Sequence, residues 1–269
     1  MCYTIKSYAP WDKKGIKLKR NINGIKKLLA ALLAASCIFT GGCSALMGNT
    51  YTSRAKDYDF SAMTMVQLEE PEEGRLAAVI HTTLGDMTAV LYPEYAPNTV
   101  DNFVNRSKDG YYDNTKIYAV YETRFAATGS AANDGSTGAS NDGQLIENEY
   151  TPNLWPFKGA LCSYSTTAGY GDSRYIICNT FDFTEEDIET LKSVQKDGKQ
   201  LFPQELIDAW VEHGSLPTLS GMQTVFGQIV EGMEVMEKIM SAEVDEETAV
   251  PKEDIFVKHI DIIEYQKNS

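Results

Sequence analysis

The sequence has few of the side chains that build metal centres. It holds three histidines, His81, His213 and His259, and five cysteines among 269 residues. The histidines share no metal-ligand spacing with one another or with the cysteines, so we expect no zinc site. His81 and His259 each fall in a β-rich run, which favours an ordinary strand-face position for both. We expect no cofactor either, because the glycine-rich stretch 128–143 lacks the strand–turn–helix order of a phosphate-binding loop.

Long apolar runs are also scarce. The run Leu28–Phe39 has twelve residues, too few for a membrane-spanning helix, which needs about 20. A basic leader precedes it and Thr40-Gly41-Gly42-Cys43 follows, an order that predicts a secretory signal over residues 1–42. The small pair before Cys43 is similar to a bacterial lipobox, which implies lipid attachment at Cys43. Ordinary secretion and an uncleaved anchor are the alternatives.

Cations are few once the leader is set aside. Residues 1–42 carry eight cations and one anion, so their removal takes the formal net charge from −14 to −21. Such a surface repels a phosphate backbone, which argues against nucleic-acid binding. It is also repelled by anionic lipid, so a lipid on Cys43 is the expected membrane attachment. We therefore expect a monomer anchored to the outer face of a bacterial cytoplasmic membrane.

Cysteine is scarce in the body of the chain. Only Cys162 and Cys178 lie beyond Cys43. Export permits a disulfide between them. Two buried thiols in strands are the favoured interpretation, and the bridge remains the alternative.

The rest of the chain divides into a tether and one domain. Residues 43–76 are polar and acidic and predict a tether, with a possible short strand at Met63–Leu68. Residues 77–267 are enough for one domain. The patterns in it predict a β-hairpin over 77–94, a helix from Pro97 that ends at Gly110, strands at 160–164, 175–178, 224–229 and 255–265, and a last helix within 230–242.

A helical hairpin is predicted within this β-rich domain, at about residues 184–214. Its first helix has Thr184 as N-cap, Asp187 three residues on, and Gly198 as stop. Its second helix has Pro203 in the first turn and ends at Gly214.

Four motifs in order resemble the cyclophilins, the peptidyl-prolyl cis–trans isomerases. They are LYPEYAPNTVDNFV at 91–104, DGYYDNT at 109–115, ENEY at 147–150, and TVFGQIV followed by EGMEVMEKI at 224–239. The resemblance covers about residues 77–265. It implies a mainly β fold, a closed eight-stranded antiparallel barrel capped by two helices, to which the helical hairpin is an addition. It also implies isomerisation of X–Pro bonds in peptides or unfolded proteins.

The residues that the family uses for this reaction are largely replaced. Where the family has Phe-His-Arg, this chain has Ile117-Tyr118-Ala119. The resemblance therefore implies that Ala119 replaces the arginine that donates to the prolyl nitrogen. The family's Phe-Met-x-Gln falls on Arg124-Phe125-Ala126-Ala127, or starts at Phe125 and ends at Thr128 if the alignment slips by one residue. Two arginines, Arg124 and Arg174, are candidate substitute donors.

The remaining substrate-binding positions of the family also differ. Tyr164 stands for an alanine, Arg174 for a glutamine and Ile176 for a phenylalanine. Thr218 stands for a tryptophan and Gln223 for a histidine, whereas Leu219 is kept. These replacements predict a slow isomerase of exported proteins, or one with rewired electrostatics. The alternative is a non-catalytic peptide-binding module on the same scaffold.

Overall fold

The computed structural model describes residues 53–267. The predicted signal peptide, Cys43 and the first part of the predicted tether lie outside the described residues. Within residues 53–267, no helix combines the length and the apolar character that crossing a membrane requires.

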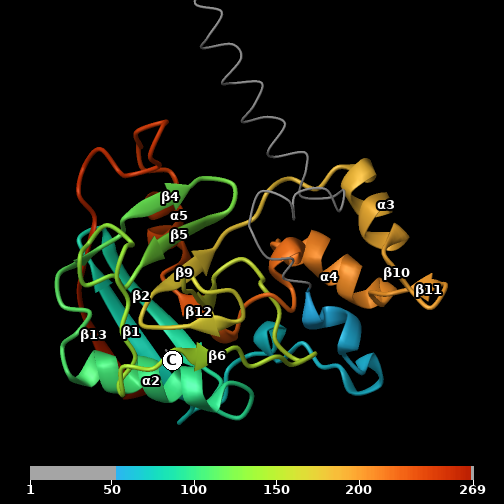
Figure 1. The fold of residues 1–269 in the computed structure, drawn as a ribbon, viewed down its shortest axis with the longest axis horizontal. Helices are drawn as coiled ribbons and strands as arrows, with labels where there is room; N and C mark the ends of the chain where they lie inside the picture. The colour runs from blue at the N-terminus through green and yellow to red at the C-terminus, as the bar shows by residue number, and fades with distance from the viewer. Residues whose placement is uncertain (1–52, 268–269) are drawn as a thin grey trace, which may run out of the picture. The chain divides into compact units, whose positions relative to one another are not determined.

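One large antiparallel sheet forms most of the domain (Figure 1). Its strands follow the order β3–β13–β1–β2–β12–β7–β9–β5–β4. Their bounds are β1 Leu76–Thr82, β2 Gly85–Leu91, β3 Thr115–Lys116, β4 Ala119–Tyr121, β5 Phe125–Thr128, β7 Ala160–Ser163, β9 Tyr175–Cys178, β12 Val225–Glu231 and β13 Phe256–Glu264. Two small pairs stand apart from it, β6 Ile146–Glu147 with β8 Tyr170–Gly171, and β10 Gln195–Lys196 with β11 Lys199–Gln200.

The mainly β class and the antiparallel sheet are confirmed, but a closed eight-stranded barrel is not what the strand pairing gives. The described sheet has nine strands and ends at β3 and β4. Only Ile117 and Tyr118 separate these two edges along the chain. The Ile117 N–H donates to Ile255 O at the β13 side, and the Tyr118 N–H donates to Ala127 O at the β5 side. The ladder is interrupted here because two successive residues bond to opposite neighbours.

The main core lies between this sheet and two helices. Helix α2 (Pro97–Lys108) contributes Val100, Phe103 and Val104, and helix α5 (Met233–Met240) contributes Val235, Met236 and Ile239. The last helix, predicted within residues 230–242, therefore packs its apolar face in the core. Gly110, with φ of 70°, follows the end of α2 as predicted for a residue just past a helix.

The predicted helical hairpin is present and builds a core of its own. Helices α3 (Glu185–Ser193) and α4 (Gln204–His213) pack together around Leu206, Trp210 and Phe202. The capping box of Thr184 and Asp187 forms as expected. The predicted stop at Gly198 is wrong, because α3 ends at Ser193. Asp197 and Gly198 have φ of 52° and 75° and form the tight turn between β10 and β11 instead.

The segment before the sheet is packed rather than a free tether from Ser53 onward. It forms three short 3₁₀ helices, η2 Arg54–Asp57, η3 Phe60–Ala62 and η4 Val66–Leu68, beside α4 in Figure 1. The strand considered at Met63–Leu68 is therefore not formed. Phe60 stacks on Trp155 with ring centroids 6.1 Å apart, and Ala55 is fully buried. The segment is held because these apolar groups complete the core of the hairpin.

Candidate functional site

A row of small and apolar side chains crosses four neighbouring strands on the face opposite the main core. Direct cross-strand pairing places them in line, in the order Ala119, Ala127, Ile176, Cys162. Their chain neighbours Val120, Ala126 and Ile177 point the other way, into the main core. This is the period-two alternation of a strand, and it brings Ala119 and Ile176, two predicted site residues, onto one face.

Four further predicted site residues border this row. Tyr118, Phe125, Tyr164 and Leu219 are partly buried against it in one hydrophobic cluster, which we call the outer cluster. Ala119 retains 8% of its surface and Ile176 only 1%. The centre of the outer cluster is thus buried and apolar, and position 119 carries no charged donor.

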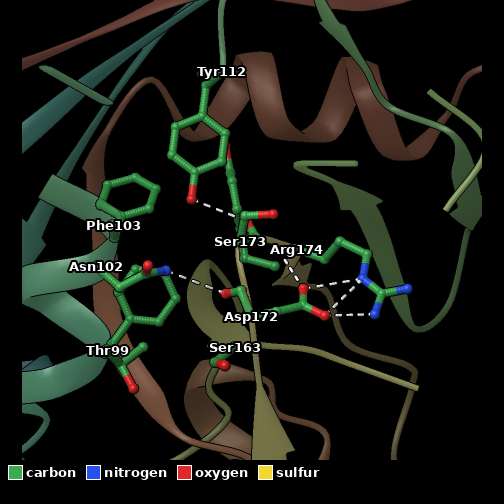
Figure 2. Close-up of a pocket in the computed structure, with 10 residues that line it drawn as sticks. Thr99, Asn102, Phe103, Tyr112, Ser163, Asp172, Ser173 and Arg174 are labelled. Carbon is green, nitrogen blue, oxygen red and sulfur yellow. Dashed lines mark hydrogen bonds and ion pairs between the residues drawn. The ribbon is translucent and has the colours of Figure 1, made fainter. Parts of the chain in front are cut away.

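Arg174 lies beside the outer cluster but is committed to other partners (Figure 2). Its Nε donates to Asp172 Oδ1 at 3.0 Å and its Nη2 to Asp172 Oδ2 at 2.5 Å. Its Nη1 donates to Gly135 O at 2.6 Å, and its guanidinium lies 5.5 Å from the centre of the Tyr164 ring. Donation of hydrogen bonds to the Asp172 carboxylate raises the pKa of Arg174, and the side chain is only 4% exposed. Arg174 is therefore a fixed, buried cation.

A small cavity borders Arg174. It measures about 10 Å³ and is lined by residues that include Asn102, Tyr112, Ser163 and Asp172 (Figure 2). Tyr112 donates to Ser173 O at 2.9 Å across it. This volume is near the lower limit for a single water, so the cavity does not hold a substrate.

Tyr118 carries a polar atom inside the outer cluster. Its hydroxyl is buried and has no hydrogen-bond partner among the described residues. Burial raises the pKa of this phenol, with neighbouring Tyr164 adding to the effect. A Cβ on Gly135 would lie 2.6 Å from the Tyr118 ring, so the loop over 129–143 packs directly on it. Tyr118 is therefore a neutral donor held beneath a glycine-rich loop.

Arg124 has the opposite character to Arg174. It sits in the exposed turn between β4 and β5, with its guanidinium 6.0 Å from the centre of the Phe125 ring. No carboxylate within residues 53–267 is close enough to form an ion pair with it. Arg124 is thus an exposed cation with a long side chain at the rim of the outer cluster.

The last predicted residues lie on the segment that follows α4. Thr218 and Leu219 belong to the 3₁₀ helix η5 (Pro217–Leu219) and are half-buried. Gln223 is half-buried, and its Oε1 has no hydrogen-bond partner within the described chain. The segment before the sheet rests on this region, because Ser53 Oγ donates to Ser220 O and the Arg54 N–H to Gly221 O. The sequence held no signal for that contact.

A second hollow was not anticipated from the sequence. It has a volume of about 390 Å³ and lies between α2 and the chain around β6, lined by Asn98, Asp101, Asn102, Ser140, Asn141, Asp142, Leu145, Ile146 and Glu147. None of the predicted site residues lines it. Its polar and acidic walls suit the apolar ring of a proline poorly.

Comparison with known proteins agrees with this arrangement. Residues 77–262 match the family model for cyclophilin type peptidyl-prolyl cis-trans isomerase/CLD. Proteins named "Putative peptidyl-prolyl cis-trans isomerase" from Staphylococcus aureus (strain USA300) and Staphylococcus epidermidis are 33% and 32% identical over 196 residues, which are 73% of this chain and 96% of theirs.

Solved structures share the fold. A Cryptosporidium parvum cyclophilin type peptidyl-prolyl cis-trans isomerase superposes with a TM-score of 0.55 at 22% identity, covering 71% of this chain and 98% of its own. The structure of that protein in the presence of the dipeptide Ala-Pro gives a TM-score of 0.54 at 21% identity, over 71% of this chain and 99% of its own.

Proposed function

Because this chain belongs to the cyclophilin-type peptidyl-prolyl cis–trans isomerase family, we propose that it isomerises X–Pro bonds of exported proteins, and does so slowly. We propose a slow rate because Ala119 stands at the centre of the outer cluster, at the position where the resemblance implies an arginine in the family. Losing one fixed charged donor costs about 2.7–4 kcal/mol of transition-state stabilisation, or 10²–10³ in rate.

The reaction needs no nucleophile, general base or metal. Its barrier is rotation about a partial double bond, roughly 18–20 kcal/mol, between isomers of similar energy. The outer cluster can receive a proline ring on the half-buried Phe125 and separate the amide from water. An apolar surface favours the twisted amide over the planar one, because twisting removes conjugation and with it charge separation. This contribution remains without the arginine.

The candidate substitute donors differ in availability. Arg174 is engaged through all three of its nitrogens, so donating to a substrate would compete with its ion pair to Asp172. Arg124 is exposed and has a flexible side chain that borders Phe125. We therefore assign Arg124 as the cation that can approach a bound peptide, and Arg174 as a positioning residue that supports Tyr164.

The alternative is a module that binds peptides without turnover. The observation in its favour is the set of bulky side chains around the row, since Tyr164 and Ile176 stand where the family has alanine and phenylalanine. Tyr164 is held in place by Arg174 above its ring and so narrows the surface that a proline ring would use.

A proline-peptide exchange measurement separates these functions. The purified protein is added to a peptide with one X–Pro bond, and cis–trans exchange is followed by NMR without a protease. The slow isomerase is supported if the protein accelerates exchange and its rate is at least about a hundredfold below that of a family member with the arginine. Peptide line broadening and shifts without exchange support the binding module instead, and a rate equal to that of such a member contradicts the loss assigned to position 119.

The role of Arg124 is tested in the same assay. Arg124→Ala should reduce the residual rate or the peptide affinity, because it removes the exposed cation beside Phe125. Lys108→Ala is the matched control, since it removes an exposed cation at the end of α2. Equal effects of the two substitutions would show that Arg124 contributes only general charge.

We also propose that the protein is lipid-anchored at Cys43 on the outer face of the bacterial cytoplasmic membrane. The support is the order of basic leader, apolar run and small residues before Cys43. The wild-type protein should partition into detergent with the membrane fraction and carry lipid on Cys43, and Cys43→Ala should lose the lipid and leave the precursor uncleaved. Recovery of wild-type protein from the medium with an unmodified Cys43, shown by mass spectrometry, contradicts the proposal.

A further inference from the structure

Two of the three histidines meet on the exposed face of β1, β2 and β13. His81 pairs directly with His259 on one side and with Asp86 on the other. The two imidazole rings stack with centroids 4.2 Å apart and planes within 17°. Asp261 lies two residues beyond His259 and therefore on the same face of β13. Residues 178 positions apart in the chain are thus brought into contact.

Two separations between ligand atoms of this cluster are near those of a coordination shell, and one of the stacked rings must turn to direct both Nε2 lone pairs at one ion. His81 Nε2 lies 3.3 Å and His259 Nε2 lies 3.6 Å from the same oxygen, Asp261 Oδ2. One ligand atom of each of the three residues lies within 4.8 Å of the others. Bonds of 2.0–2.1 Å to a tetrahedral ion place neighbouring ligand atoms about 3.3–3.4 Å apart. We propose that His81, His259 and Asp261 bind a divalent transition-metal ion, with a fourth position open to water.

Asp86 supports this assignment from outside the shell. Its Oδ1 lies 3.0 Å from His81 Nδ1, which directs the imidazole proton to that nitrogen and leaves the lone pair on Nε2. The Nε2 atom is buried, and its 3.3 Å contact with Asp261 Oδ2 does not have the geometry of a hydrogen bond. The carboxylate–histidine–metal arrangement is the usual way in which a protein fixes a ligating imidazole.

The strands are also shaped for the site. The register of β1 and β13 shifts between His81 and Thr82, because Thr82 pairs with Val257 and Lys258 is left as an extra residue. A bulge of this kind redirects the next side chain and increases the local twist. As a result Lys258 and His259 are both exposed in succession, and His259 shares a face with His81.

The donor set selects the class of ion. Two imidazole nitrogens and one carboxylate oxygen suit Zn²⁺, Cu²⁺ and Ni²⁺, whereas Mg²⁺ and Ca²⁺ prefer all-oxygen shells. A proton shared between Asp261 and one histidine is the competing explanation, because it too would bring these atoms together. The four residues lie on β1, β2 and β13 and are not among the predicted peptide-binding residues.

Calorimetric titration of the metal-free, reduced protein with Zn²⁺ at neutral pH tests the proposal. We expect one saturable event that His259→Ala abolishes and that Asp86→Ala weakens about 10–100-fold. His213→Ala is the matched control, because this exposed histidine lies at the end of α4 and should leave binding unchanged. Binding by Cys2, Cys37 or Cys43 is common to all four proteins, so only the event that differs between them is assigned to the histidine cluster. Mg²⁺ should give no comparable event.

Thermal unfolding provides an independent readout. Saturating Zn²⁺ should raise the Tm of the wild type and of His213→Ala but not that of His259→Ala, because a ligand that binds only the folded state stabilises it. Circular dichroism of the His259 variant confirms that it folds. Absence of binding in the wild type, or equal binding in His259→Ala, overturns the proposal and leaves the shared proton as the explanation of the cluster.

Discussion

Arg174 and Asp172 form an almost completely buried ion pair, with side chains 4% and 2% exposed. Removing the arginine alone strands a buried carboxylate. Arg174→Ala should therefore lower the free energy of unfolding by about 3–5 kcal/mol, measured by urea denaturation. Arg124→Ala, the exposed counterpart, should stay within about 0.5 kcal/mol of wild type.

The double variant Arg174→Met with Asp172→Leu provides the control for this prediction. Replacing both charges by apolar groups removes the unpaired carboxylate, so much of the lost stability should return. An Arg174→Ala protein as stable as wild type would show that the pair is open to water in solution.

Local signals in the sequence predicted the helices well. Helix α2 begins at Pro97 and ends before Gly110, and α3 begins at the capping box of Thr184 and Asp187. Such signals can be read from the sequence because caps and turns depend on residues a few positions apart. The end of α3 was misjudged for the same reason. Gly198 can end a helix or form a turn, and only the pairing of β10 with β11 decides between them.

Contacts between distant residues could not be predicted. The packing of Phe60 on Trp155 joins residues 95 positions apart, so the first packed segment looked like a tether. The candidate site was found only because the family motifs supplied a register for Ala119 and Ile176. The same limit concealed the pairing of His81 with His259, which were interpreted separately as strand-face histidines.

An arginine at position 119 should raise the rate of isomerisation. Ala119 faces Ala127 across the β4–β5 pair and retains 8% of its surface, so an arginine there must extend past its neighbours to the surface of the outer cluster, where it would supply the missing donor. Ala119→Arg should therefore raise the isomerisation rate by up to about 10²–10³ in the NMR exchange assay. Ala119→Met, of similar length without a donor, should not. A rise in both variants would assign the gain to apolar contact.

The two body thiols should be inert in the folded protein. Cys162 and Cys178 are fully buried with their sulfurs 3.4 Å apart. The hydrogen bond with Cys162, together with burial, raises the pKa of Cys178 well above its ordinary value. Because the thiolate is the reactive form, iodoacetamide should label neither residue at neutral pH until denaturant is added, as read by mass spectrometry.

The same shift has a sign for stability. An unfolded cysteine loses its proton at a pH of about 8.5. In the folded state Cys178 keeps its proton above that pH, because its pKa is raised. This stabilisation is complete below that pH and declines as the pH rises further. Cys178→Ser should flatten the alkaline fall in the free energy of unfolding. Rapid native labelling of both thiols would contradict the buried arrangement.

Because of Thr218, the protein should bind cyclosporin weakly. Typical cyclophilins bind this cyclic peptide beside a tryptophan at the position that Thr218 is predicted to occupy. An indole can bury about 150–250 Å² of surface and donate a hydrogen bond from its N–H, and a threonine can do neither. Ala119 and Gln223 are predicted to replace two further flanking residues, so calorimetry should show no saturation at micromolar drug. Thr218 is half-buried on η5 beside Leu219, so Thr218→Trp can present its ring to the outer cluster. That variant should recover part of the affinity, whereas Thr218→Val should not. Submicromolar binding by the wild type would overturn the equivalence of Thr218 with the tryptophan.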